Sequence, residues 1–510
     1  MAAKARCGQS SRRYISVGDS GGAVDRRLLR RSSARGATFT FLAQAVKFSL
    51  RFGSQLVLAR LLLPADFGLV AMVLPLVALV QLLGEFGIAP AIIQRPTLDP
   101  GQLSAAFSIT IIANTVLMIG FAAAAPLIAS MYGEPRAVPL AEALAVLVLM
   151  SALYQYPYAL LNRQLQFGKL AVVEVVACAA AVTSGLSAAF YGLGYWSLIV
   201  MPIAETAIGL LLVCAVTKWR PSWPVFGADV IALFRFGSHA TANEVATHVT
   251  RQVDKVLIGA VHGRVALGIY DRASNLYAQP VMHLIHPITR IAIPVLARVV
   301  HEQHLYRRAF AETIRLAFLV SIPAMLTFAL MPETTVRLLL GPNWDPVAPV
   351  LRWFCIGSLA APLQAGMAWL FMSQGRTGEQ LRIGILTSAI SISSFIAGVS
   401  EGPSGVAALW ALSTLVISTP VTVWAGTRAG PVGLRDFVLA VRPLVLAGCA
   451  VAVLLSFGRV IFPLDTALMF SINLGAAYAG LLVMLLLLPN GSELLHIFAK
   501  LRGSWGPGER

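Results

Sequence analysis

Charged and amide side chains recur at helical spacing along two mostly apolar segments that together run from Asn243 to Arg298. Within each segment, successive polar residues are three or four positions apart, which places them on one face of an α-helix. The first segment presents Glu244, His248, Arg251 and Lys255, and the second presents Asp271, Asn275, Gln279, His283, His286 and Arg290.

Both segments are long enough to cross a lipid bilayer, so each helix would carry charge inside the membrane. A charge near the bilayer centre costs about 2.5–3.5 kcal/mol even on permissive insertion scales. These polar faces must therefore meet water or another polar helix instead of lipid. The pattern predicts an aqueous cavity within a membrane protein.

Basic residues outnumber acidic ones among the charges that fall in these segments and in the first two apolar segments of the chain. Cations in a cavity of low dielectric constant attract an anion, and the planar guanidinium of arginine suits phosphate oxygens in particular. We therefore predict a binding site for an anionic substrate, formed by Lys47, Arg51, Arg251, Lys255, Arg272 and Arg290 with the amides Asn275 and Gln279.

Four carboxylates lie on or beside the same polar faces and are candidates for coupling transport to an ion gradient: Glu85, Glu244, Asp254 and Asp271. A simpler alternative is internal pairing, in which Arg251 binds Asp254 or Lys255 binds Asp271 and the pair ties helices together. Four further carboxylates fit helix packing better than proton transfer: Glu142, Glu174, Glu205 and Glu312.

The composition is that of a membrane protein, since 57% of the 510 residues are hydrophobic and only 12% are charged, against about 25% charged in soluble domains. The net charge of +16 does not indicate nucleic-acid binding, because much of it lies in the first 35 residues and in short loops. The five cysteines suggest no disulfide framework, since four of them lie inside apolar segments.

About 14 apolar segments follow one another from Gly36 onward, which predicts an all-α membrane fold. Lysine and arginine concentrate in alternate loops, and the positive-inside rule then places both termini in the cytoplasm. The predicted parts are a disordered basic cytoplasmic tail (1–35), an N-lobe of six helices (36–217), a cytoplasmic linker (218–228), a C-lobe of six helices (229–427), two extra helices (428–490) and a C-terminal cytoplasmic tail (491–510).

The chain also contains an internal repeat. When the sequence is compared with itself, Gln44 aligns with Glu244, Arg51 with Arg251, and Gln55 with Lys255. The polar face of the first helix is thus in register with that of the seventh. Six segments separate the copies, so both halves have the same orientation in the membrane, an arrangement known among transporters.

Motifs for covalent chemistry are missing from the sequence. It has neither a Walker A motif nor a Gly-x-Ser-x-Gly elbow, and the pair His283 and His286 has no cysteine or carboxylate nearby to complete a metal site. We therefore expect a protein that is not an enzyme and that uses no cofactor or metal.

Three stretches around the seventh and eighth segments, Asp254–Gly259, Ala266–Ala273 and Ile293–Arg298, resemble the signature of bacterial polysaccharide-export flippases. Leu58–Val70 is similar to the first-hairpin pattern of the same group. These are lipopolysaccharide, exopolysaccharide and O-antigen translocases of the multidrug/oligosaccharidyl-lipid/polysaccharide (MOP) exporter superfamily. The resemblance implies two pseudo-symmetric six-helix lobes around a central cationic cavity, plus two C-terminal helices.

The resemblance further implies a substrate, an oligosaccharide on a polyprenyl diphosphate, moved by alternating access from the cytoplasmic to the outer leaflet of the bacterial inner membrane. Its partners would be this lipid-linked glycan, membrane lipids, and a polysaccharide polymerase and co-polymerase, with no nucleic acid. Two alternatives from the same superfamily stay open, a flippase for the peptidoglycan lipid precursor and a multidrug or cation antiporter. A surplus of basic residues argues against cationic drugs because like charges repel.

Overall fold

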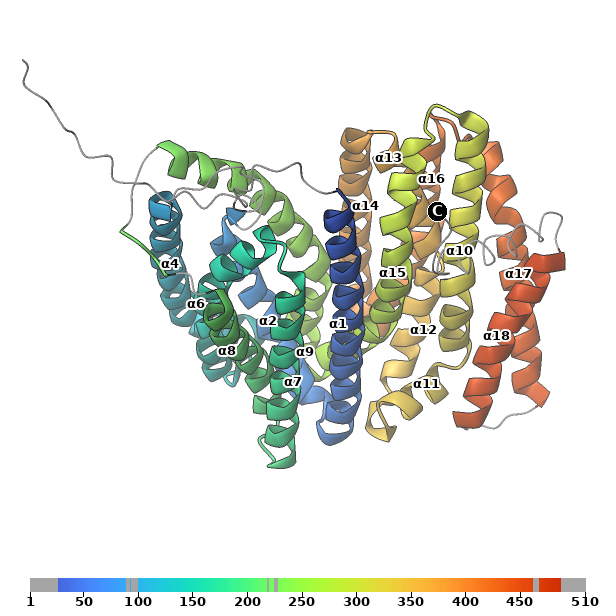
Figure 1. Cartoon of the computed structure of the whole chain (residues 1–510). Helices are drawn as coiled ribbons and strands as arrows, with labels where there is room; N and C mark the ends of the chain where they lie inside the picture. The colour runs from blue at the N-terminus through green and yellow to red at the C-terminus, as the bar shows by residue number, and fades with distance from the viewer. Residues whose placement is uncertain are drawn as a thin grey trace, which may run out of the picture. The chain divides into compact units, whose positions relative to one another are not determined.

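The computed structural model describes residues 26–88, 92, 100–217, 220–223, 228–461 and 467–487, and every regular element in this part of the chain is a helix. Ten of these helices or helix series are long and apolar enough to cross a membrane. The predicted all-α membrane fold is confirmed. Figure 1 shows the helices along the chain.

The chain divides into two compact units, Met1–Gln252 and Val253–Arg510. The first contains α1 (Arg26–Leu61), α2 (Pro64–Glu85), α4 (Pro100–Ala123), α5 (Ala125–Tyr132), α6 (Ala137–Arg163), α7 (Phe167–Phe190), α8 (Trp196–Thr217) and the start of α9 (Ala228–Arg298). Helix α7 packs against both α1 and α8, and α6 packs against α2, α4 and α8. The long helix α1 is thereby fixed along the side of α7.

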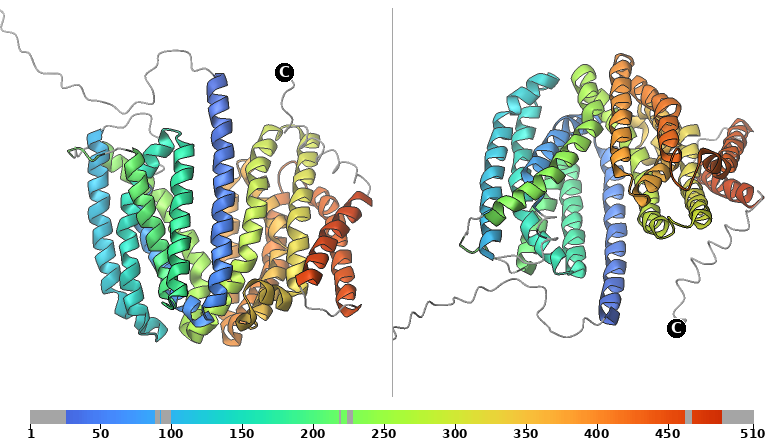
Figure 2. Two further views of the ribbon diagram at one scale, coloured as in Figure 1. Left: turned by 60° about the horizontal axis from the view of Figure 1, so that its bottom comes forward. Right: turned by 90° about the horizontal axis from the view of Figure 1, so that it is seen from above.

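The second unit contains the remainder of α9 and all later elements: α10 (Gln303–Leu330), α11 (Pro332–Leu339), η1 (Pro342–Trp344), α12 (Val347–Ser358), α13 (Ala361–Ser373), α14 (Thr377–Gly398), η2 (Val399–Glu401), α15 (Gly402–Ser413), the π-helix η3 (Thr414–Ser418), α16 (Thr419–Thr427), α17 (Leu434–Ile461) and α18 (Ala467–Leu487). Helices α17 and α18 lie side by side and pack on α10, as Figure 2 shows in red and yellow.

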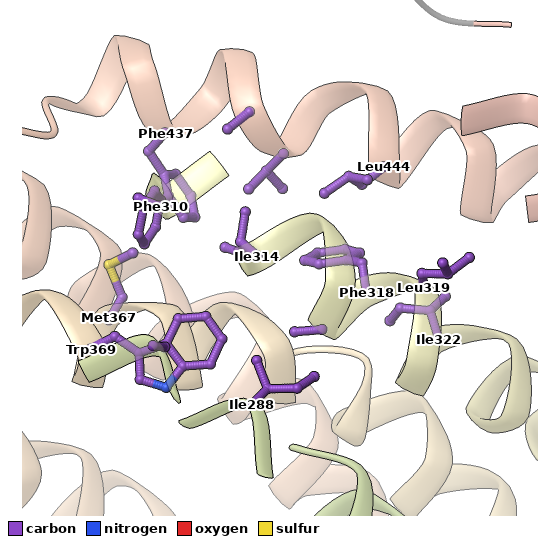
Figure 3. Packing of buried hydrophobic residues seen from close by; sticks show 14 of the residues in the cluster. Ile288, Phe310, Ile314, Phe318, Leu319, Ile322, Met367, Trp369, Phe437 and Leu444 are labelled. Carbon is purple, nitrogen blue, oxygen red and sulfur yellow. The ribbon is translucent and has the colours of Figure 1, made fainter. Parts of the chain in front are cut away.

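A hydrophobic cluster holds the second unit together around α10. Phe310, Ile314 and Phe318 of α10 meet Trp369 of α13 and Phe437 of α17 (Figure 3). Fully burying a large apolar side chain stabilises the fold by about 1.5–3 kcal/mol. The cluster therefore ties the C-terminal helices to the body of the unit.

Two of the apolar spans, Thr247–Arg298 with 52 residues and Thr377–Thr427 with 51, are more than twice the length that one crossing needs, which is about 20 residues. Each contains a glycine with positive φ, Gly263 (φ 75°) and Gly402 (φ 73°), where the helix direction can change. Only glycine adopts this conformation without steric cost. The predicted number of 14 crossings depends on how these spans divide and stays a prediction.

Helix α1 begins at Arg26, earlier than the predicted boundary at Gly36. Arginine and leucine, which dominate its first turns, are good helix formers, so the helix extends into the basic segment. Residues 1–25 of the tail predicted at 1–35, the predicted C-terminal tail (491–510) and part of the predicted linker (218–228) lie outside the described residues. The predicted lobe boundaries stay a prediction.

Candidate functional site

The basic face of α1 is covered by two carboxylates, one from α7 and one from α8. The Nζ atom of Lys47 lies 2.8 Å from Oε2 of Glu174, and Gln44 donates to the same oxygen at 3.4 Å. The hydroxyl of Tyr158 on α6 donates to the other carboxylate oxygen at 2.9 Å. Glu174 thus joins three helices through three donors, in keeping with the packing role expected for it.

One turn further along α1, Nη2 of Arg51 lies 2.5 Å from Oε1 of Glu205 on α8. This pair is more open than the first. The side chains of Arg51 and Glu205 are 53% and 30% exposed, whereas those of Lys47 and Glu174 are 15% and 18% exposed. Both predicted cations of α1 therefore already have an acidic partner in this structure.

The helix break at Gly263 folds α9 into a hairpin, which brings residues 16 positions apart into contact. Nζ of Lys255 lies 2.8 Å from Oδ1 of Asp271, and Nη2 of Arg272 lies 2.7 Å from Oδ2. The internal Lys255–Asp271 pair, left open as an alternative from the sequence, is confirmed. The other alternative, Arg251 with Asp254, is not formed.

Two further contacts complete this hairpin cluster. The amide of Asn275 donates to Oδ2 of Asp271 at 3.0 Å, and the hydroxyl of Tyr270 donates to Oδ2 of Asp254 at 2.8 Å. Asp254 and Asp271 are both buried. Because buried carboxylates require partners, these contacts are what makes burial of the two acids tolerable. Four predicted binding or coupling residues are thus engaged with one another here: Lys255, Asp271, Arg272 and Asn275.

Two of the predicted binding-site cations, Arg251 and Arg290, have no such partners among the described residues. Arg251 and Arg290 of α9 are exposed, and neither forms an ion pair or hydrogen bond within the part of the chain that the structure describes. Both lie in an apolar span of membrane length. They are the arginines best placed to take an external anion. The predicted amide Gln279 lies on the same helix and is partly buried.

The two remaining predicted carboxylates, Glu85 at the end of α2 and Glu244 in the first part of α9, are close enough for their charges to interact. Nearby, Nε2 of His248 lies 3.0 Å from the carbonyl oxygen of Pro75 in α2. That contact connects the polar face of α9 to α2 within the first unit. Among the described residues, no group of histidine, cysteine and carboxylate side chains could hold a metal ion.

Glu205, Glu174 and Tyr158 are the site residues that the sequence did not single out as partners of the α1 cations. The sequence provided only weak evidence for these contacts, because Glu174 and Glu205 are each isolated within an otherwise apolar segment. An isolated carboxylate in a membrane-spanning helix requires a cation or hydrogen-bond donor, but the sequence does not say which helix supplies it.

Comparison with known proteins identifies the group to which this fold belongs. Residues 57–349 match the family described as polysaccharide biosynthesis protein. Among its relatives, the lipopolysaccharide biosynthesis protein WzxC of Escherichia coli (strain K12) is 25% identical over 381 residues, which cover 72% of this chain and 76% of that protein. The succinoglycan biosynthesis transport protein ExoT of Rhizobium meliloti (strain 1021) is 23% identical over 81% of this chain and 78% of its own length.

Solved structures show the same fold at low sequence identity. The lipid II flippase MurJ in its inward closed conformation aligns with a TM-score of 0.70 and 14% identity over 90% of this chain and 99% of its own. An inward-facing multidrug resistance MATE transporter of the MOP superfamily aligns with a TM-score of 0.57 and 14% identity, over 76% of this chain and 97% of its own. With its membrane-spanning helices and the match over residues 57–349, the chain belongs to the polysaccharide biosynthesis protein family and has the fold of MOP superfamily transporters.

Proposed function

We propose that this protein moves a polyprenyl-diphosphate-linked oligosaccharide from the cytoplasmic to the outer leaflet of the bacterial inner membrane, by alternating access, during polysaccharide biosynthesis. A diphosphate and several sugars cannot cross hydrocarbon unaided, because polar groups in lipid cost several kcal/mol each when unsatisfied. The protein must supply a polar path for the head group while the prenyl chain stays in lipid.

The observation that carries this proposal is the pair of exposed arginines on α9. Arg251 and Arg290 have no acidic partner in the described part of the chain, although they lie in a helix of membrane length. Such charges are costly unless they face water or an anion. A diphosphate offers several oxygens, and a single guanidinium can bind two of them through parallel hydrogen bonds.

The names of the relatives support a polysaccharide precursor as the cargo. The names of WzxC and ExoT refer to lipopolysaccharide and succinoglycan biosynthesis. A third relative, the teichuronic acid biosynthesis protein TuaB of Bacillus subtilis (strain 168), is 24% identical over 58% of this chain. The likeness to the lipid II flippase and the MATE transporter supports the fold alone. Polysaccharide synthesis is therefore favoured over peptidoglycan precursor transport or drug export.

The direct test is deletion of the gene followed by analysis of lipid-linked sugars. We expect a polyprenyl-diphosphate glycan to accumulate on the cytoplasmic side and the matching surface polysaccharide to disappear, with wild-type protein restoring both. Accumulation of the peptidoglycan precursor instead would support the lipid II alternative and contradict the proposal.

A further inference from the structure

The two carboxylates that cover the α1 cations are held in different ways. Glu174 accepts from Lys47, Gln44 and Tyr158 and is mostly enclosed. Glu205 has a single donor among the described residues, Arg51, and is more exposed. Three donors from two helices fix the first carboxylate in place, whereas the second is held by one contact.

Arg51, the arginine of the second pair, also has N–H donors that do not contact Glu205. Arg51 reaches Glu205 through Nη2 alone, although a guanidinium can form two parallel hydrogen bonds with one oxyanion. More than half of its side-chain surface is exposed, 53%. An incoming diphosphate can therefore approach this guanidinium while Glu205 is still bound, and can offer the two-point contact that Glu205 does not make.

We propose that Glu205 is an exchangeable counter-ion, which occupies Arg51 when no substrate is bound and gives it up to the diphosphate of the lipid-linked glycan. This inference rests on the proposed function. Exchange of one anion for another keeps an anion on Arg51 in either state, and because the Arg51–Glu205 pair is partly exposed, separating it costs little free energy.

The same exchange provides a route to release. If Arg51 had no competing carboxylate, its contact would add to the affinity for the diphosphate both before and after translocation. Competition from Glu205 lowers the affinity by the free energy of the Arg51–Glu205 pair, so the head group can leave once the site opens outward. Lys47 stays with Glu174 throughout, and keeps α1 attached to α7.

The test measures binding of farnesyl diphosphate, a short polyprenyl diphosphate, to the purified full-length protein. The proteins compared are wild type, Glu205→Gln, Arg51→Ala and the double variant. We expect Glu205→Gln to bind about fivefold more tightly, which corresponds to about 1 kcal/mol for a partly exposed pair. Arg51→Ala should bind more weakly than wild type, and the gain from Glu205→Gln should vanish in its background.

The matched control is Glu174→Gln, which removes the same charge from the neighbouring helix. We expect this variant to lower the unfolding temperature and to change the affinity by less than twofold, because Lys47 is enclosed. An equal gain in Glu174→Gln, a gain that persists without Arg51, or no gain in Glu205→Gln would each overturn the inference. Failure of every protein, wild type included, to bind the probe would contradict the proposed function itself.

A second measurement uses the wild-type protein, and it tests the proposal even if Glu205→Gln does not fold. Infrared difference spectra of the wild-type protein, recorded on addition of farnesyl diphosphate, should show a carboxylate band shift as Glu205 leaves Arg51. The shift should be missing in Arg51→Ala. If the wild-type protein binds farnesyl diphosphate and its carboxylate band does not shift, the exchange is refuted.

Discussion

Leu165 and Gly375 occupy the same position in two copies of one helix cap, one in each unit. Both residues have positive φ, 56° and 71°, and each lies two positions after the last residue of its helix, α6 or α13. The N–H of Leu165 donates to the carbonyl of Asn162 and that of Gly375 to the carbonyl of Met372. In each cap, the next residue donates back to the carbonyl five positions earlier, as in a Schellman motif.

This shared cap predicts that Leu165→Gly stabilises the protein. A side chain in the left-handed region costs about 1–2 kcal/mol, and Leu165 is exposed, so its removal sacrifices little packing. We expect the free energy of unfolding to rise by about 1 kcal/mol, and Gly375→Ala to lower it by a similar amount. Denaturant or thermal unfolding in detergent measures both. Destabilisation by Leu165→Gly would show that its side chain has a packing role.

Asp271 is the central acceptor of the hairpin cluster, which predicts a large effect of Asp271→Asn on stability. The substitution leaves Lys255 and Arg272 enclosed without their anion, and removing one partner of a buried ion pair costs about 3–5 kcal/mol. The matched control is Glu312→Gln, which breaks the exposed pair with Arg308 on α10 and should cost less than about 1 kcal/mol. Equal losses in the two variants would refute a structural role for the cluster.

The sequence was enough to predict the helical fold and a contact between residues close together in the chain. It was not enough to predict contacts between residues far apart in the chain. Apolar run lengths predicted an all-α membrane fold, and Lys255 with Asp271 could be named because a short hairpin separates them. Glu174 and Glu205 meet α1 from 127 and 154 positions away, and nothing in the pattern of a single helix specifies which neighbour it faces. The predicted free cations Lys47 and Arg51 consequently turned out to be paired.

The loop charges predict the membrane orientation, which cysteine labelling can test. In a variant without the five natural cysteines, Gln164→Cys and Thr377→Cys lie next to predicted cytoplasmic arginines and should be protected from an impermeant thiol reagent added outside. Asn343→Cys and Glu401→Cys, on predicted outer loops, should be labelled. All four positions are exposed in the structure. The reverse pattern would invert the orientation.

Glu85 is the preferred candidate for coupling transport to a proton gradient. It has no basic residue within one turn on α2, and its charge interacts with that of Glu244, whereas Asp254 and Asp271 are committed to the hairpin cluster. Transport of a lipid-linked glycan into vesicles should be faster with an imposed proton gradient for wild type, and insensitive to the gradient for Glu85→Gln. Equal gradient dependence in the two proteins would remove Glu85 from the mechanism.

Translocation itself is tested most directly in reconstituted vesicles that contain a fluorescent polyprenyl-diphosphate oligosaccharide, with wild-type protein, Arg251→Ala or Arg251→Lys. Arg251 is the most informative position to substitute, because it forms no ion pair with a described acidic residue and its replacement therefore breaks none. One charge-assisted contact is worth about 1.5–3 kcal/mol, so Arg251→Ala should slow the exposure of the glycan to an external reagent by about tenfold or more. Arg251→Lys should recover part of the rate, because it keeps the charge but loses the two-point contact. Glycan movement that does not depend on the protein, or equal rates for wild type and a normally folded Arg251→Ala, would contradict the account.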